Sequence, residues 1–306
     1  MTAKAEEKRK EEKFSEIYEY HPLSKYEGLR GKFQCRAPTT YVGVEVELEK
    51  VQLKTNPPSS WKTVTDGSLK LDGKEFITVP IRFCYLEQEL VRLFGSMKPP
   101  HVSSRCSIHV HMNARDFTQQ ELLRFVLLYL IFEKSLFNFS GGRSANIFCT
   151  PLYESIPIVA AQLSKLQKGD GFIKFVRWNK YFALNICPIW GQQEESKRTG
   201  TIEFRHMAGT TDVEHIIEWV NLIVSLKIAA KKLSTDSLIT NLLTMNSTSS
   251  YDNLVDVVFK EWAVHLTEQE TFKEDVEHGV MVAKEALSLK TKDVEISIPF
   301  TNRRNK

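Results

Sequence analysis

Residues 106–113 read Cys-Ser-Ile-His-Val-His-Met-Asn, and polar and apolar side chains alternate along this segment. In an extended strand successive side chains point to opposite faces, so His109 and His111 share one face with Asn113. Two neighbouring imidazoles suit a metal ion or a phosphate, because neutral imidazole is a good ligand and its protonated form pairs with anions. A partly exposed strand without a ligand is the simpler interpretation of an isolated His-x-His pair, since short motifs often occur by chance.

Residues 41–51 show the clearest strand pattern in the chain, Tyr-Val-Gly-Val-Glu-Val-Glu-Leu-Glu-Lys-Val. The aliphatic side chains fall on one face, and Glu45, Glu47 and Glu49 fall on the other. An edge strand with a solvent-exposed acidic face is the alternative interpretation of this pattern alone.

A second charged strand is predicted at residues 201–207, Thr-Ile-Glu-Phe-Arg-His-Met. Strict alternation places Glu203, Arg205 and Met207 on one face of that strand and His206 on the apolar face. For the Glu–Arg pair alone, a surface ion pair of little energetic value is the alternative.

An Asp66-Gly67 pair lies between residues 61–64 and 75–81, two short segments with strand character. Asp-Gly is a frequent hairpin turn, so the two segments are predicted to pair, and Asp66 is interpreted as a turn residue. Glu75 begins the second of these strands.

If these strands are neighbours in one sheet, their shared face gathers several carboxylates, two imidazoles and an arginine. Oxygen ligands with a few imidazoles suit Mg²⁺ or Mn²⁺ better than zinc. An arginine at the same place suits a phosphate group that bridges such metal ions.

Helical patterns frame these strands. Residues 118–138 predict an apolar helix, with Thr118 as N-cap and Glu121 completing a capping box. After residue 213 helical spacing of apolar residues dominates. The chain is therefore predicted to be an α+β protein with an antiparallel sheet in its first two thirds and a helical final third.

Composition narrows the class of protein. The 306 residues are 42% hydrophobic and 26% charged, as in ordinary globular proteins, and the net charge of +3 argues against specific nucleic-acid binding. Five widely spaced cysteines argue against a disulfide framework and for a reducing compartment. The charged N-terminal segment lacks the apolar core of a signal peptide, and no apolar run is long enough to cross a bilayer. We therefore expect a cytoplasmic protein without a membrane partner.

Several of these segments, in this order, resemble the amidoligase family, which is similar in turn to glutamine synthetase and other carboxylate–amine ligases. The segments are Gly-Val-Glu-Val-Glu-Leu-Glu, Asp-Gly-Ser-Leu, Glu-Phe-Ile-Thr-Val-Pro, Cys-Ser-Ile-His-Val-His-Met-Asn, Tyr-Phe-Ala-Leu-Asn and Thr-Ile-Glu-Phe-Arg-His-Met-Ala-Gly-Thr. The resemblance implies a glutamine synthetase-like antiparallel sheet with flanking helices, whose concave face holds ATP between metal ions. It also implies a catalytic domain over residues 41–230, preceded by a charged arm and irregular lead-in over residues 1–40. A helical C-terminal extension over residues 231–306 is expected to pack on that domain.

The resemblance implies roles for the matching residues. The expected metal ligands are Glu45, Glu47, His109 and Glu203, with the first two on different metal ions. The candidate catalytic residues are Arg205, which is expected to bind phosphate, His111 and Glu75. The candidate ATP-binding or substrate-binding residues are Arg205, Arg143, Arg177 and Asn185, and completing a strand edge is the alternative role of Asn185. Relatives often carry glycine where this chain has Ser107, which leaves less room for a ligand to approach the backbone.

The activity implied is an ATP- and Mg²⁺-dependent (or Mn²⁺-dependent) ligase that forms an amide bond through an acyl phosphate. Its carboxylate and amine substrates would be an amino acid, a peptide or a protein side chain. Neither GxxxxGK[ST] nor GxGxxG occurs in the chain, so another device is expected to hold ATP. A metal-dependent hydrolase that uses the same face, and a catalytically inactive amidoligase-like binding protein, are the alternatives.

Overall fold

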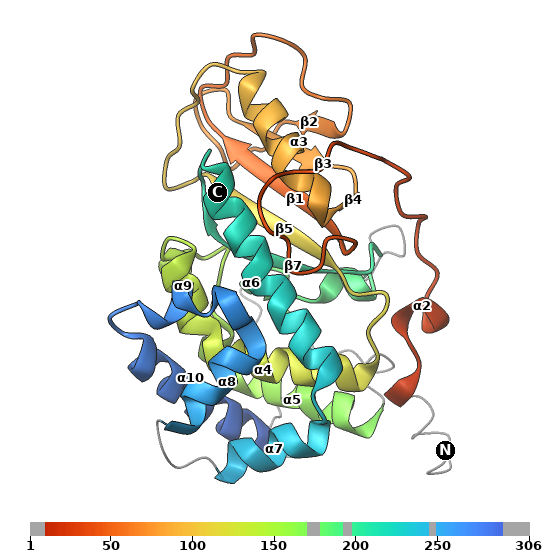
Figure 1. Cartoon of the computed structure of the whole chain (residues 1–306), viewed down its shortest axis with the longest axis vertical. Helices are drawn as coiled ribbons and strands as arrows, with labels where there is room; N and C mark the ends of the chain where they lie inside the picture. Colours follow the sequence, from red (N-terminus) through yellow and green to blue (C-terminus); the bar gives the residue numbers. More distant parts are fainter. Residues whose placement is uncertain (1–9, 170–177, 192–197, 245–248, 290–306) are drawn as a thin grey trace, which may run out of the picture.

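A seven-stranded antiparallel sheet forms the upper half of the molecule in Figure 1. The computed structural model describes residues 10–169, 178–191, 198–244 and 249–289. The strands are β1 (Tyr41–Leu48), β2 (Trp61–Val64), β3 (Lys74–Thr78), β4 (Ile81–Arg82), β5 (Ser107–Asn113), β6 (Leu184–Asn185) and β7 (Thr201–Ala208). Their order is β2-β3-β1-β5-β7-β6, and β4 pairs with one end of β1. The predicted α+β class with an antiparallel sheet is confirmed.

Helices cover one side of the sheet and build a layer beneath it. The helices of the described residues are α2 (Phe14–Ile17), α3 (Phe83–Gly95), α4 (Gln119–Phe139), α5 (Ile156–Lys168), α6 (Val213–Lys232), α7 (Thr235–Thr244), α8 (Ser249–Phe259), α9 (Val264–Thr267) and α10 (Phe272–Ser288). In Figure 1, α3 and α6 lie in front of the sheet, whereas α4, α5, α7, α8 and α10 lie below it. The opposite side of the sheet therefore remains for the polar side chains of the strands.

The two faces of β1 differ as its alternation predicts. Val42, Val44, Val46 and Leu48 are at most 1% exposed and belong to the main hydrophobic core. Ile108, Val110 and Met112 of β5 are buried on the same face. The glutamates of β1 and the histidines of β5 consequently share the other face.

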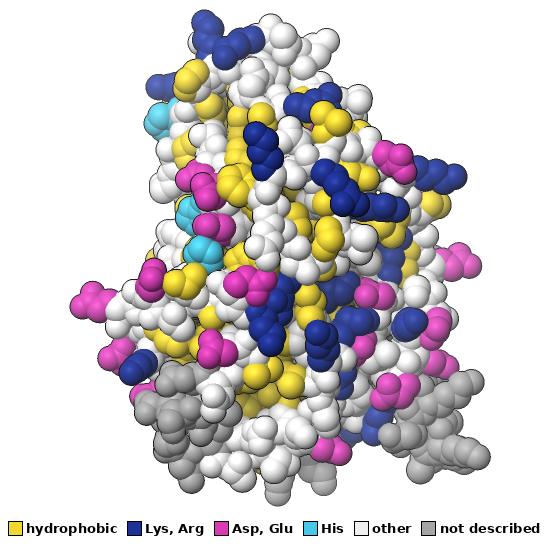
Figure 2. Space-filling view, in the orientation of Figure 1, with side chains coloured by type: hydrophobic (Ala, Val, Ile, Leu, Met, Phe, Trp, Pro, Cys, Tyr) yellow, Lys and Arg dark blue, Asp and Glu magenta, His cyan; other side chains and the backbone are white. Residues whose placement is uncertain are grey.

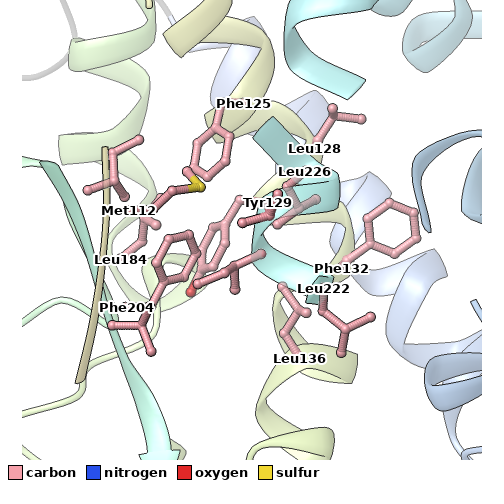
Figure 3. Packing of buried hydrophobic residues seen from close by; sticks show 14 of the residues in the cluster. Met112, Phe125, Leu128, Tyr129, Phe132, Leu136, Leu184, Phe204, Leu222 and Leu226 are labelled. Carbon is pink, nitrogen blue, oxygen red and sulfur yellow. The ribbon is translucent and has the colours of Figure 1, made fainter. Parts of the chain in front are cut away.

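The core beneath the sheet is built mainly from aromatic and aliphatic side chains of α4 and α6. Figure 3 shows Met112 and Phe204, from two neighbouring strands, pointing towards Phe125 and Tyr129 of α4. The rings of Phe125 and Phe204 meet edge to face, with centroids 6.1 Å apart. This contact holds β7 against the helical layer.

A polar network lies inside this core. Glu133 of α4 accepts hydrogen bonds from Leu152 N at 2.6 Å, Tyr153 N at 3.1 Å and the Tyr129 hydroxyl at 2.9 Å. The Tyr129 oxygen also lies 2.6 Å from Nε2 of His206, a fully buried residue of β7. Burial raises the pKa of Glu133 to about 7 and lowers that of His206 to about 3, because both charged forms lose their hydration.

The start of α4 carries the predicted capping box. The Thr118 side chain accepts a hydrogen bond from Glu121 N at 3.2 Å, and Thr118 N donates to Glu121 Oε2 at 2.8 Å. Two of the backbone donors at the helix start are thereby satisfied, so this prediction is confirmed.

α10 crosses α4 at very short range. A Cβ atom at Gly279 would lie 2.1 Å from the carbonyl oxygen of Ile131, so only glycine fits at this crossing. The helical final third thus packs directly on α4, while the domain boundaries near residues 40 and 230 stay a prediction.

Two strand predictions need adjustment. The apolar run at residues 181–189 predicts one strand before β7, but only β6 is extended, and a 3₁₀ turn over Cys187–Ile189 follows it. Pro188 lies in that turn and cannot donate to a strand ladder, which explains the early end. The hairpin of β2 and β3 is present, with Thr63 opposite Phe76, although residues 65–73 connect the strands by a loop rather than a two-residue turn.

Surface charge and cysteine chemistry add two observations. Lys and Arg side chains are interspersed with Asp and Glu over the face shown in Figure 2. All five cysteines are free thiols, and four of them are buried. Across the described ranges, every helix is too short or too polar to cross a membrane.

Candidate active site

Three central strands bring the predicted site residues to one face of the sheet. β5 pairs with β1 on one side and with β7 on the other. In this register Glu45 lies directly opposite His109, and His111 lies directly opposite Glu203. Side chains opposite one another in an antiparallel pair have Cβ atoms about 4.5–5.5 Å apart, so their polar ends can meet.

Glu45 lies between the two histidines. Its Oε2 is 3.0 Å from Nδ1 of His109, and its Oε1 is 3.1 Å from Nε2 of His111. Burial alone would raise the pKa of Glu45, but His111 and His109 outweigh it and hold the value well below the usual range. For His111, burial acts to lower the pKa, yet Glu45 outweighs it and raises the value to about 9. Carboxylate and imidazole thus stabilise each other's charged forms.

Glu203 is fixed by three neighbours. Its Oε1 accepts a hydrogen bond from the guanidinium of Arg205 and lies 3.7 Å from Nδ1 of His109. Its Oε2 accepts a hydrogen bond from Asn185 Nδ2 at 2.7 Å, and Asn185 Oδ1 in turn accepts one from Cys187 N at 3.0 Å. Asn185 therefore holds Glu203 from β6, while its expected contact with nucleotide or substrate stays a prediction.

A β-bulge in β7 consists of Arg205 and His206. β7 pairs with β5 at Phe204–Val110 and at Met207–Ile108, so two residues of β7 lie opposite His109 alone. The shift turns Met207 to the apolar face, where it is 1% exposed. The prediction that Met207 shares the face of Glu203 was therefore wrong, because alternation within one strand does not reveal an extra residue in its pairing.

A second acidic group lies at the β3 side of this face. Glu75 is opposite Glu47 in the β1–β3 pair, and carboxylate oxygens of Glu47, Glu75 and Asp66 lie within 4.8 Å of one another. Burial, together with the charges of Glu45 and Glu47, raises the pKa of Glu75 to about 8. Asp66 accepts a hydrogen bond from Ser68 N at 2.7 Å, as a turn residue does, but it also belongs to the site.

These side chains fit divalent cations. Ligand atoms within 4.8 Å of one another occur in three groups, which are Glu45–His111–Glu203, Glu45–Glu75–His109 and Glu47–Asp66–Glu75. Octahedral Mg²⁺ binds its ligands at about 2.1 Å, so adjacent ligand atoms are about 3.0 Å apart. The separation of 3.0 Å between Glu45 Oε2 and Nδ1 of His109 matches this spacing. Carboxylate oxygens with a minority of imidazoles are the donor set expected for Mg²⁺ or Mn²⁺.

A cavity of about 330 Å³ opens beside these carboxylates and histidines. Acidic, basic and aromatic side chains line it, among them Glu47, Asp66, His109, Arg105, Arg143, Arg205, Phe148 and Tyr181. Arg205 Nε donates to Phe148 O at 2.9 Å, and Arg143 donates to Arg205 O at 3.1 Å. Nε of Arg143 is buried with no hydrogen-bond partner among the described residues. The lining therefore combines guanidinium donors with carboxylates.

The sequence-predicted residues that lie within the described ranges thus converge. Glu45, Glu47, Glu75, His109, His111, Glu203 and Arg205 share the sheet face, and Arg143 lines the cavity beside it. Arg177 lies outside the described residues. Glu49 does not join the site, because its carboxylate binds Lys70 N at 2.8 Å and lies 3.4 Å from His101 Nδ1.

Comparison with known families agrees with this geometry. Residues 37–227 match the family model described as "putative amidoligase enzyme", which indicates an amide-forming ligase. The chain belongs to this amidoligase family. A search of curated proteins finds no match.

Proposed function

We propose that this protein is an ATP-dependent carboxylate–amine ligase that requires Mg²⁺ or Mn²⁺, with a sheet of the glutamine synthetase-like catalytic type. Its substrates would be a carboxylate and an amine on an amino acid, a peptide or a protein side chain. One observation carries the proposal. Glu45, His109, Glu203 and Arg205 converge on one sheet face, next to a cavity with arginines, in a chain of the amidoligase family.

The proposed reaction has two steps. A carboxylate is a poor electrophile, so the γ-phosphoryl group of ATP is first transferred to its oxygen, which gives an acyl phosphate and ADP. The amine nitrogen then attacks the acyl carbon, loses a proton, and displaces inorganic phosphate to leave the amide. Phosphoryl transfer depends chiefly on positioning and charge neutralisation, which a face of this kind can supply.

Each group on the face has a proposed part in this reaction. Glu45, Glu47, His109 and Glu203 would hold the metal ions, whose chemistry is to neutralise phosphate charge and align the reacting oxygens. Arg205 would bind a phosphoryl oxygen, because Glu203 and Phe148 O already fix the direction of its guanidinium.

Three further residues complete the arrangement. His111 would offer its positive charge to phosphate or substrate, since its pKa is raised to about 9, while Thr201 Oγ1 at 3.0 Å from Nδ1 and Glu45 at Nε2 fix its ring. Arg143 lines the cavity, and its guanidinium would bind an anionic group of the nucleotide or substrate. Glu75, whose pKa is raised to about 8, would accept the proton that the amine loses.

The test combines ATP turnover with trapping of the acyl phosphate. Purified protein, ATP and Mg²⁺ are incubated with panels of carboxylates and amines, with hydroxylamine added to convert an acyl phosphate into a hydroxamate. We expect ADP release that depends on metal and carboxylate, with hydroxamate formed in step. Metal-dependent hydrolysis without ATP would instead support the hydrolase, and no turnover with any pair would support an inactive binding protein.

A matched pair of variants locates the activity. Glu203→Gln should abolish metal-dependent ADP release and leave the thermal unfolding midpoint near that of the wild type, because only the charge at the site is lost. Glu274→Gln, on an exposed part of α10, controls for the same chemical change elsewhere. Unchanged turnover in Glu203→Gln would remove this residue from the site.

A further inference from the structure

Ser107, the first residue of β5, lies between two of the proposed metal ligands. Its Oγ is 2.9 Å from Nε2 of His109 and hydrogen bonds with Oε2 of Glu47. The serine is 1% exposed, so water does not compete for its hydroxyl. Glu47 and His109 belong to different potential metal groups, one with Asp66 and one with Glu45. The hydroxyl therefore connects the two groups.

The direction of these hydrogen bonds follows from the number of protons. A serine hydroxyl has one proton to donate, and an ionised carboxylate can only accept. Ser107 therefore donates to Glu47, and its oxygen is left to accept a hydrogen bond from His109. The acceptor role of the serine requires a proton on Nε2 of His109. Nδ1, the other ring nitrogen, is the atom that faces Glu45 Oε2 at 3.0 Å and Glu203 Oε1 at 3.7 Å.

We propose that Ser107 is a positioning residue that keeps the proton of His109 on Nε2, so that Nδ1 is the nitrogen that binds the metal ion. The chain Glu47–Ser107–His109 does what a carboxylate bound directly to a ligand histidine does elsewhere, which is to fix the ring orientation and the tautomer. Because Glu47 is itself a proposed ligand, the same chain fixes the two metal positions relative to each other. The inference rests on the proposed function only in that the face binds divalent metal.

A serine that merely fills a small buried space would behave differently. In that case its hydroxyl could be removed without effect on His109, and alanine would serve as well. Ser225 of α6 is such a residue, fully buried and with a hydroxyl that has no partner among the described residues. Ser225→Ala therefore provides the matched control for loss of a buried hydroxyl.

The first experiment measures Mn²⁺ affinity by electron paramagnetic resonance, without ATP. We expect Ser107→Ala to weaken binding by about 10–100-fold, the usual effect of losing a partner of a ligand histidine. Ser107→Thr, which keeps the hydroxyl, should recover most of the affinity, and Ser225→Ala should bind as the wild type does. Wild-type affinity in Ser107→Ala, or no Mn²⁺ binding by the wild-type protein, would overturn the inference.

The second experiment identifies the ligand nitrogen. An asparagine side chain puts its oxygen near the position of Nδ1, whereas glutamine reaches the position of Nε2. We therefore expect His109→Asn to retain more Mn²⁺ affinity than His109→Gln. In ¹⁵N-histidine spectra of the wild type, Mg²⁺ should shift the Nδ1 resonance of His109 while Nε2 stays protonated. The reverse order of affinities, or a shift at Nε2 instead, would refute the assignment.

These measurements separate the inference from the proposed function. None of them includes ATP or tests amide formation. If Ser107→Ala weakens Mn²⁺ binding in a protein that never releases ADP, the proposed ligase is overturned and the positioning role is supported. If the protein forms hydroxamate in a metal-dependent way but Ser107→Ala leaves the Mn²⁺ affinity unchanged, the ligase is supported and the positioning role is overturned.

Discussion

The buried glutamate of α4 makes a prediction about stability and pH. Glu133 is 1% exposed, and its pKa rises from the ordinary 4.5 to about 7 because burial disfavours the charged carboxylate. The folded protein therefore holds this proton more tightly than the unfolded chain does. The resulting stabilisation is complete below pH 4.5 and is lost as the pH rises through 7. A shift of 2.5 pKa units, at about 1.4 kcal/mol each, corresponds to about 3 kcal/mol.

Glu133→Gln removes this titration while it keeps the shape of the side chain. We expect the free energy of unfolding of the wild type, minus that of the variant, to fall by about 3 kcal/mol between pH 4 and pH 8. Urea unfolding followed by circular dichroism at each pH measures the difference. His206 is present in both proteins, so its own titration cancels, and Glu274→Gln controls for the loss of a surface carboxylate. A difference that stays constant over this range would refute the argument.

Two further predictions concern the site and the helix crossing. Arg205→Lys should lower ADP release at saturating substrate by about 10-fold or more. The point charge of lysine cannot replace the forked guanidinium, which binds Glu203 and a phosphate together. Equal ADP release in both proteins would contradict phosphate binding by Arg205. Gly279→Ala should destabilise the protein by more than about 2 kcal/mol, since its Cβ would meet Ile131 O. In a helix without that contact the same change would stabilise the protein by about 1 kcal/mol. Gly95→Ala of α3 is the control, because nothing beyond its own helix backbone and chain neighbours lies within 4 Å of the added Cβ. Urea unfolding measures both variants.

The parts of the fold that depend on local pattern were predictable. The alternation in β1 showed both which side chains enter the core and which glutamates face away from it. The start of α4 was readable from Thr118 and Glu121, because a capping box involves residues only three apart. Glu203 and Arg205 were identified with the correct face because Glu203 precedes the bulge in β7 and Arg205 is its first residue, so alternation still holds between them.

The parts that depend on pairing between distant segments were not predictable. The bulge that redirects Met207 exists only in the register of β7 against β5. In the sequence Ser107 was notable only because relatives often have glycine at this position. The positioning role depends on Glu47, which lies on another strand. Asp66 was interpreted as a turn residue alone, because nothing near it in the chain indicates the carboxylates that it meets in space.

β5 lies in the sheet between one strand that is synthesised before it and one that is synthesised after it. β1 is complete before β5 leaves the ribosome, so this pair can form early, but the other neighbour of β5 is β7. At about 5–20 residues per second, several seconds pass before β7 is made. During that time one edge of β5 has no partner strand, and His109 has Glu45 but not Glu203 beside it. A nascent chain that ends before β7 would thus carry three of the four proposed ligands, Glu45, Glu47 and His109, together with an open strand edge of the kind that chaperones protect.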